Sequence, residues 1–315
     1  MHALNLDRTK LWARWSKKFR AARSYFWRCH FEAAARFRSE PGIGVPGRTP
    51  EIIVSLTTTP ARLPKVHLAI ETLLQQSCPP HRLILWLSAA LTPGDLPAAL
   101  RRQQRRGLDV RFRRDLRSYT QLIYVLREHP DSIILTADDD TFYPRDWLRQ
   151  LHESHLRQPG FIHCQRAHLM RETPAGPLHP YREWEFFSPG QTGPSLPLLP
   201  TGVGGVLYPP RVLPAEVFYE TIFLKLCPTA DDIWFKAMAL LAGVPTVKVA
   251  PAFREYPTVP GTQRQRLMDI NWTEASNDRQ IQAVFGHYDL LPLSELRPCF
   301  QPGGQLSICG FQAHE

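Results

Sequence analysis

The stretch Ser132-Ile133-Ile134-Leu135-Thr136-Ala137-Asp138-Asp139-Asp140 decides the fold of this 315-residue chain. Its first six residues predict a buried strand, and three consecutive aspartates follow that strand at once. A solvated turn that caps the next helix is one explanation, but three adjacent carboxylates repel one another unless a cation or donors compensate. Alternate residues of an extended chain point the same way, so Asp138 and Asp140 are expected to face one pocket. Oxygen ligands of this kind suit Mg²⁺ or Mn²⁺.

Apolar runs and helical stretches alternate on both sides of this strand. We predict strands at 51–56, 83–87, 110–112, 132–137 and 246–249, and helices at 63–76, 97–106, 121–128 and 231–241. Strands separated by helices indicate an α/β fold with a mostly parallel, doubly wound central sheet flanked by helices. Ligands of such sheets bind beyond the carboxyl ends of the strands, so the residues after each strand are candidate site residues.

The net charge of +9 belongs almost entirely to the N-terminus. Residues 1–50 carry eleven basic and three acidic side chains, which leaves the other 265 residues close to neutral. The main body is therefore not expected to bind nucleic acid. With 43% hydrophobic residues the chain is long enough and apolar enough to bury one large core.

The cysteines and the hydropathy indicate a cytoplasmic protein. Six cysteines are scattered without CxxC spacing, which supports neither a disulfide framework nor a zinc site, so we expect reduced thiols. No apolar run approaches the ~20 residues that cross a bilayer, and the N-terminus has no apolar signal sequence.

Residues 1–48 are predicted to form a basic amphipathic helix and a linker. Apolar residues recur there at spacings of three and four, namely Trp12, Trp15, Phe19, Ala22 and Phe26. Two interpretations stay open: residues 8–38 contact an anionic membrane surface at its inner, cytoplasmic face, or the aromatic stripe packs on the body. The Pro- and Gly-rich residues 40–47 are typical of a linker. A catalytic domain is expected at 49–290, divided near residue 145, with a tail at 291–315.

A second acidic cluster, Asp231-Asp232, opens the predicted helix at 231–241. Capping of the helix would explain aspartates at this place. The functional interpretation is that one of these carboxylates is a general base, which removes a proton from an acceptor hydroxyl. The segment 200–206 precedes it, and Gly204 and Gly205 would allow a close approach of the backbone to a ligand, although a glycine-rich bend in a strand has the same pattern.

The loop after the first strand, from Thr57 to Arg62, is a polar turn suited to nucleotide contacts. Neither a P-loop nor a GxGxxG segment follows the predicted strands, which argues against a kinase and a dinucleotide-dependent oxidoreductase.

Four segments in this order resemble the GT-A glycosyltransferases, specifically the bacterial enzymes grouped with glycosyltransferase family 2. They are 54–58, 134–140, 202–209 and 230–234, within a match over about 52–288. The resemblance implies a GT-A fold, a nucleoside-diphosphate sugar donor, a glycan or lipid-linked acceptor, and inversion at the anomeric carbon. A role in bacterial surface glycan synthesis would agree with it.

The resemblance also assigns roles to single residues. It implies a DXD site in which Asp138 and Asp140 hold Mn²⁺ or Mg²⁺, and it makes Asp232 the base, with Asp231 beside it. The expected donor-binding residues are Thr57, Thr58, Thr59, Arg62, Asp115, Asp138 and Asp139. The expected acceptor-side residues are Gly204, Gly205 and Trp234.

One departure from the family concerns a Gly-Pro-x-x-Lys pattern, whose lysine position is Gln121 in this chain. Arg114 or Arg117 is expected to replace that cation. Arg264 and Arg266 lie in a segment that is similar to a donor-closing loop, and either balance diphosphate charge or are solvated. His163, His168 and His287 are candidate third metal ligands, although a structural or exposed position is the expected one.

Two other functions remain as alternatives. A sugar-nucleotide nucleotidyltransferase would share the sheet and the metal, but its glycine- and lysine-rich signature is absent from the sequence. A non-catalytic scaffold of GT-A fold would attach to membranes through its N-terminus; the presence of both aspartate clusters argues against it.

Overall fold

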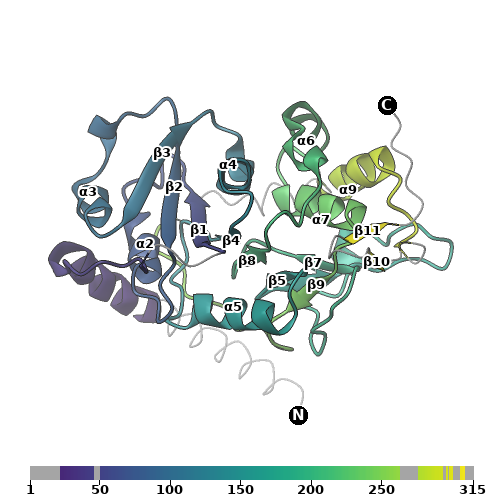
Figure 1. Ribbon diagram of the computed structural model, residues 1–315, viewed down its shortest axis with the longest axis horizontal. Coiled ribbons are helices and arrows are strands. Elements are labelled where there is room, and N and C mark those ends of the chain that lie inside the picture. The colour runs from purple at the N-terminus through teal and green to yellow at the C-terminus, as the bar shows by residue number, and fades with distance from the viewer. Residues whose placement is uncertain are drawn as a thin grey trace, which may run out of the picture.

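A seven-stranded sheet forms the centre of the protein in this computed structural model, which describes residues 22–45, 50–262, 276–293, 296, 298–300 and 306–308. The strand order is β3-β2-β1-β4-β8-β5-β9 (Figure 1). These strands are β1 (Ile52–Thr57), β2 (Arg82–Ser88), β3 (Leu108–Arg113), β4 (Ile133–Thr136), β5 (Ile162–Cys164), β8 (Val206–Tyr208) and β9 (Thr246–Lys248). All strands predicted from the sequence are present.

The sheet is mostly parallel, as predicted. Strands β1 to β4 pair in parallel, and so do β5 and β9, whereas β8 runs antiparallel to both β4 and β5. The sequence did not predict β5 or β8, which have only three residues each. The observed architecture is thus a mixed α/β fold of the Rossmann-like kind.

Helices cover both faces of the sheet (Figure 1). Alternate residues of β1 face opposite sides of the sheet. Val54 belongs to the apolar cluster that includes residues of α2 (His67–Leu73), α3 (Ala98–Gln104) and α5 (Trp147–Arg157). Ile53 belongs to the cluster on the other side. That other side holds α4 (Thr120–Glu128), α6 (Glu220–Leu226), α7 (Asp231–Leu241) and α9 (Ser276–His287). Burial on both faces explains why the strands have continuous apolar runs.

Smaller elements surround this sheet. Two antiparallel pairs are formed by β6 (Ala167–Leu169) with β7 (Leu198–Pro200), and by β10 (Pro298–Phe300) with β11 (Leu306–Ile308). Short 3₁₀ helices lie at Pro93–Asp95, Arg117–Tyr119, Tyr181–Glu183 and Ala215–Phe218. The predicted helix at 63–76 is shorter in the structure, because Arg62 and Leu63 both donate to the Thr59 carbonyl and form a turn before α2.

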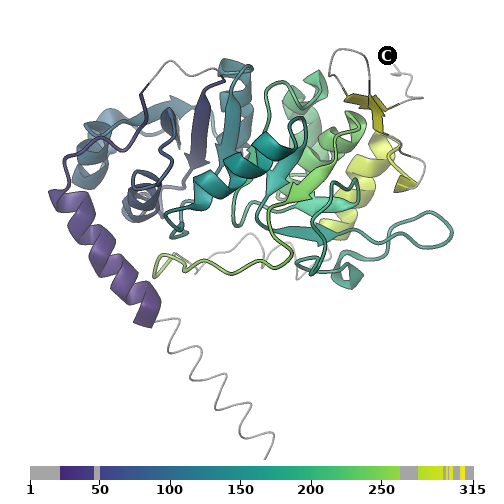
Figure 2. The same ribbon diagram turned by 60° about the horizontal axis from the view of Figure 1, so that its bottom comes forward.

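An N-terminal helix spans residues 22–37 and lies along the body (Figure 2). Its buried side carries Phe31, which stacks on Phe142 with ring centroids 5.5 Å apart. The predicted linker is fixed where it is described, since Gly42 donates to the Arg106 carbonyl and Gly44 to that of Pro80. Trp12, Trp15 and Phe19 of the predicted stripe lie outside the described residues.

Candidate active site

The loop after β1 and the aspartates after β4 meet at the carboxyl edge of the sheet, because β1 and β4 are parallel neighbours. Thr58 Oγ1 donates to Asp139 Oδ2. Arg62 Nη1 lies 2.7 Å from Asp139 Oδ1 and 3.2 Å from Asp140 Oδ2. The structure therefore joins the two segments that the sequence named as the donor side.

Within the triplet, the three aspartates have different surroundings. Asp139 is 6% exposed and points to the β1 loop, where it shares the Arg62 guanidinium with Asp140. Asp138 forms no ion pair in the part of the chain that the structure describes, and its N–H donates to Tyr143 Oη over 2.7 Å. Burial raises the pKa of Asp138 well above its ordinary value, and the charges of Asp140 and Asp139 raise it further.

The antiparallel strand β8 brings the second half of the chain to the same edge. Val206 at its start pairs with Thr136 of β4, so the preceding glycine loop lies beside Asp138. A Cβ atom placed on Gly202 would lie 3.6 Å from Asp138 Oδ1 and 3.6 Å from Asp232 Oδ1. The two carboxylate oxygens are thus at most about twice that distance apart, although 94 positions separate the residues in sequence.

Asp232 has the environment of a base. It lies in the first turn of α7, and the Gly202 N–H donates to its Oδ1 and Oδ2 over 3.0 and 3.2 Å. Burial raises the pKa of Asp232 to about 7, the Asp231 charge adds to this, and the Gly202 hydrogen bond and Arg166 oppose it. A carboxylate with such a pKa accepts a proton near neutral pH.

Asp231 faces a different partner. Gln121 Nε2 donates to Asp231 Oδ2 over 3.2 Å, and burial raises the pKa of this carboxyl as well. Gln121, the residue at the family's lysine position, is therefore placed at the second acidic cluster. Both acidic clusters and Gln121 meet in one region of the molecule.

The three residues expected on the acceptor side lie in packed surroundings. Gly205, with φ of +90°, lies against Trp147, whose Cζ2 would be 2.4 Å from a Cβ at this position. Gly204, with φ of +98°, lies against Phe253. Trp234 is fully buried on α7, where its ring faces Phe223 and Tyr288. These close approaches are to the protein's own aromatic rings.

Arg166 is a residue of the site that the sequence reasoning missed. It follows β5, and its Nε donates to Thr201 Oγ1 over 2.6 Å. Burial lowers its pKa, and the charges of Asp232 and Asp138 partly offset this. The signal in the sequence is only a basic residue after a short apolar run, and the three residues of β5 were too few to be predicted as a strand.

The remaining donor-side residues are spread along the same edge. Thr57 Oγ1 donates to the Trp86 carbonyl, and the Thr59 carbonyl closes the turn before α2. Asp115 lies in the turn after β3 and accepts from the Arg117 N–H over 2.7 Å. The structure brings none of these three into hydrogen-bond contact with the aspartate triplet.

The two arginines expected to replace the lysine have other partners. Arg114 pairs with Glu220, and Arg117 Nη1 donates to the Pro228 carbonyl. His163 is buried between Ser154 and the Gln158 carbonyl, His168 accepts from the Phe187 N–H, and His287 is exposed at the end of α9. Arg264 and Arg266 lie outside the described residues.

The charge of the site fits a divalent metal ion. Five carboxylates, those of Asp138–Asp140 and Asp231–Asp232, gather with two guanidinium groups, those of Arg62 and Arg166. No group of three His, Cys, Asp or Glu side chains in the described ranges could hold a metal by itself. Magnesium-type sites use one or two carboxylates and complete the sphere with substrate phosphates, and the Asp138–Asp140 triplet has the carboxylates that such a site requires.

Comparisons with known proteins give distant structural similarities only. No family model and no curated protein matches the chain. A mannosyltransferase from Pyrobaculum calidifontis in complex with GDP-Man and Mn²⁺ is 18% identical, with 86% of this chain and 73% of that chain covered and a TM-score of 0.43. A CMP:2-keto-3-deoxy-manno-octonic acid synthetase complexed with CTP is 12% identical, with 66% and 93% covered and a TM-score of 0.38. Such scores carry no functional argument, so the function is argued from the site.

Proposed function

We propose that this protein transfers a glycosyl group from a nucleoside-diphosphate sugar to an acceptor hydroxyl, with inversion. The observation that carries the proposal is the convergence of Asp138 and Asp232 on Gly202. One carboxylate cluster follows a parallel strand and suits a metal-bound diphosphate, and the other has the raised pKa and the backbone donor of a base. The resemblance to bacterial family 2 enzymes supports the same assignment and a role in surface glycan synthesis.

In this mechanism each cluster has one task. Asp138 and Asp140 would hold Mn²⁺ or Mg²⁺, which would supply positive charge beside a diphosphate leaving group. Thr58 and Arg62 fix Asp139 and, through it, the backbone of the triplet. Asp232 takes the proton of the acceptor hydroxyl, while the Gly202 N–H keeps its carboxylate oriented. Inversion follows from a single displacement, since the base and the leaving group act on opposite sides of the anomeric carbon.

The test is a transfer assay over a panel of nucleoside-diphosphate sugars with Mn²⁺, in which released nucleoside diphosphate and glycosylated product are measured. Asp232→Asn should lower kcat about 10²- to 10⁴-fold and leave donor binding intact. Asp140→Asn should weaken donor binding with Mn²⁺ and change it little without the metal. Asp131→Asn, at an exposed ion pair with Arg211, is the matched control and should behave as the wild type.

Other results would contradict the proposal. Formation of a sugar nucleotide and pyrophosphate from a nucleoside triphosphate and a sugar phosphate would identify the nucleotidyltransferase alternative. Turnover that persists at the wild-type rate in Asp232→Asn would show that Asp232 is not the general base. Donor binding without turnover under all these conditions would favour the scaffold.

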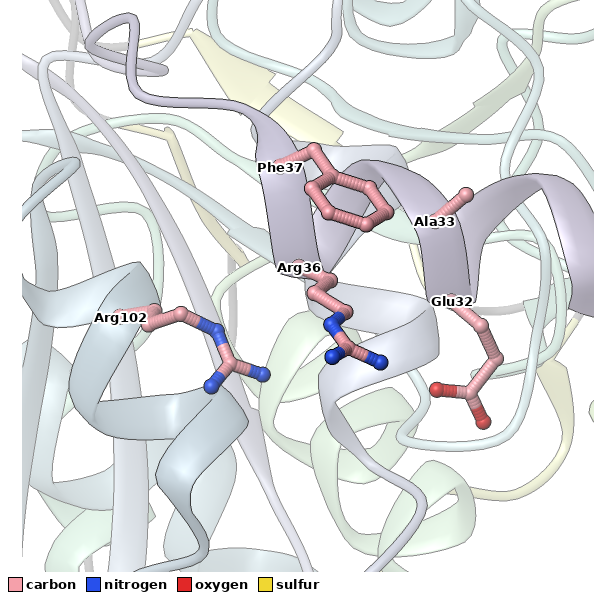
Figure 3. A pocket seen from close by; sticks show the side chains of 5 residues that line it. All are labelled: Glu32, Ala33, Arg36, Phe37 and Arg102. Carbon is pink, nitrogen blue, oxygen red and sulfur yellow. The ribbon is translucent and has the colours of Figure 1, made fainter.

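We further propose that the N-terminal helix places the protein on an anionic membrane surface. One side of this helix packs on the body, but Tyr25, Phe26 and Phe37 are 62%, 70% and 75% exposed. Arg36 lies beside the Phe37 ring, and Arg102 and Glu32 line the same pocket between this helix and α3 (Figure 3). Exposed aromatic rings among basic side chains suit the headgroup region of an anionic bilayer. No helix of the described residues is long and apolar enough to cross a bilayer.

Co-sedimentation with vesicles tests this. Binding should require anionic lipid and fall with salt, and Phe26→Ala with Phe37→Ala should reduce it several-fold. Leu156→Ala, at a 64% exposed leucine of α5, is the control and should have no effect. Equal binding of the double variant and the wild type would exclude the helix as the contact.

A further inference from the structure

The contacts of Arg166 indicate more than compensation of the charges of Asp138 and Asp232. Its Nε donates a hydrogen bond to Thr201 Oγ1, and its guanidinium forms no ion pair among the residues that the structure describes. The guanidinium carbon lies over two aromatic rings, 5.8 Å from the centroid of Phe187 and 6.0 Å from that of Phe253. The group is therefore held in place by contacts that leave its terminal donors for another partner.

A buried lysine holds the backbone of the segments that carry the two rings. Lys248 Nζ donates to the carbonyls of Phe187, Ser188 and Pro251, at 2.7, 2.6 and 3.1 Å, and to Ser188 Oγ. Phe187 and Ser188 have positive φ values of 61° and 36°, which side chains rarely adopt. Lys248 thus binds a strained turn to the segment that leads to Phe253. On its other side, Phe253 lies against the backbone of Gly204.

One short loop sets the place of both Arg166 and the proposed base. Thr201 accepts from the Arg166 guanidinium, and the next residue, Gly202, donates its N–H to Asp232. The guanidinium and the carboxylate are consequently neighbours with a fixed relative position. The other cation of the site, Arg62, is paired with Asp139 and Asp140 on the donor side.

We propose that Arg166, Phe187 and Phe253 form a subsite for an anionic acceptor sugar, whose carboxylate or phosphate binds the guanidinium while its hydroxyl faces Asp232. The proposal rests on the proposed function for the role of Asp232. A planar guanidinium binds such groups through two parallel hydrogen bonds, which fixes the orientation of the sugar as well as its affinity. Phe187 is 41% exposed and offers an apolar face at the mouth of this subsite.

Binding of matched probes tests the subsite without any need for turnover. Methyl β-glucuronide and glucose 6-phosphate carry the anion, and methyl β-glucoside is their neutral counterpart. NMR titration should show that the wild type binds at least one anionic probe about 10-fold or more tightly than the neutral one. Arg166→Gln should remove this preference, and Arg166→Lys should restore part of it, since it keeps the charge but not the planar fork.

Arg171→Gln is the control, because Arg171 is exposed and its loss changes the net charge equally. It should keep the preference. Equal binding of anionic and neutral probes by the wild type would overturn the proposal. So would a donor-binding defect of Arg166→Gln with an unchanged acceptor preference, since the guanidinium would then serve the donor diphosphate.

The outcome separates the subsite from the proposed function. An Arg166-dependent preference in a protein that transfers no sugar from any donor would keep the subsite and refute the glycosyltransferase. Transfer that depends on Asp232 but shows no Arg166-dependent preference would keep the enzyme and refute the subsite.

Discussion

The two halves of the molecule compensate their carboxylates in different ways. In the first half, strands β1 to β3 have six or seven residues, and Asp139 and Asp140 pair directly with the Arg62 guanidinium. In the second half, β5, β8 and β9 have three residues each, and the partly buried Asp232 is held by the Gly202 N–H. A nearby cation stabilises the charged carboxylate, whereas burial stabilises the protonated one.

This difference agrees with the two roles that we propose for one sheet edge. Asp139 and Asp140 lie beside the Arg62 cation and suit a site for a metal and a diphosphate, although burial raises the pKa of Asp138 in the same triplet. A buried carboxylate with one backbone donor has its pKa near 7 and suits proton transfer. The comparison predicts opposite consequences when the charge of Asp139 or that of Asp232 is removed.

The largest expected effect is on the stability of Asp232→Asn, which should be higher than that of the wild type at alkaline pH. Its pKa in the folded state, about 7, lies above the ordinary value of 3.8, so the folded state binds the proton more tightly between these values. Stability therefore falls as pH rises from about 4 to 7 and stays low above that range. Asp232→Asn does not ionise, so it should be more stable than the wild type at pH 8, by on the order of 3 kcal/mol.

Thermal unfolding at pH 5 and pH 8 measures this. The extra stability of Asp232→Asn over the wild type should be much smaller at pH 5, where the native carboxyl is already protonated. A variant that is less stable than the wild type at both pH values would show that Asp232 is held as a charged structural group.

The packing of the second half gives the next effect. Gly205→Ala combines a positive φ with a Cβ atom 2.4 Å from Trp147, whereas Gly190→Ala has a similar φ of +79° and no atom within 4 Å. The backbone cost is common to both variants, so Gly205→Ala should be less stable by about 2 kcal/mol beyond Gly190→Ala. Urea unfolding of both variants checks this, and equal values would mean that Trp147 moves without cost.

The smallest effect concerns the first half. Asp139→Asn removes the charge that Arg62 faces at 2.7 Å, but Arg62 is partly exposed and keeps Asp140. We expect a loss of about 1 kcal/mol in the free energy of unfolding. The sign is opposite to that of Asp232→Asn at pH 8, and Asp131→Asn at its exposed pair should change little. A stabilised Asp139→Asn would abolish the contrast between the halves.

The sequence predicted the long strands and the aspartates after them, because their apolar runs and the place of the carboxylates are local features. It also named the Thr57–Arg62 loop as suited to nucleotide contacts, and the structure joins this loop to the triplet through Thr58 and Arg62. It did not predict β8 or Arg166. β8 has only three residues and follows a glycine-rich loop, and the position of Arg166 depends on Thr201, which lies 35 positions away.

The sequence by itself determined the class of fold and the two acidic clusters, since apolar strand segments and the aspartates that follow them are recognised from neighbouring residues. Only the tertiary structure decided that the clusters meet. The antiparallel insertion of β8 between β4 and β5 brings Gly202, Asp138 and Asp232 together. It also decided which cation faces which carboxylate, because electrostatic interactions and burial depend on distances between segments that are remote in sequence.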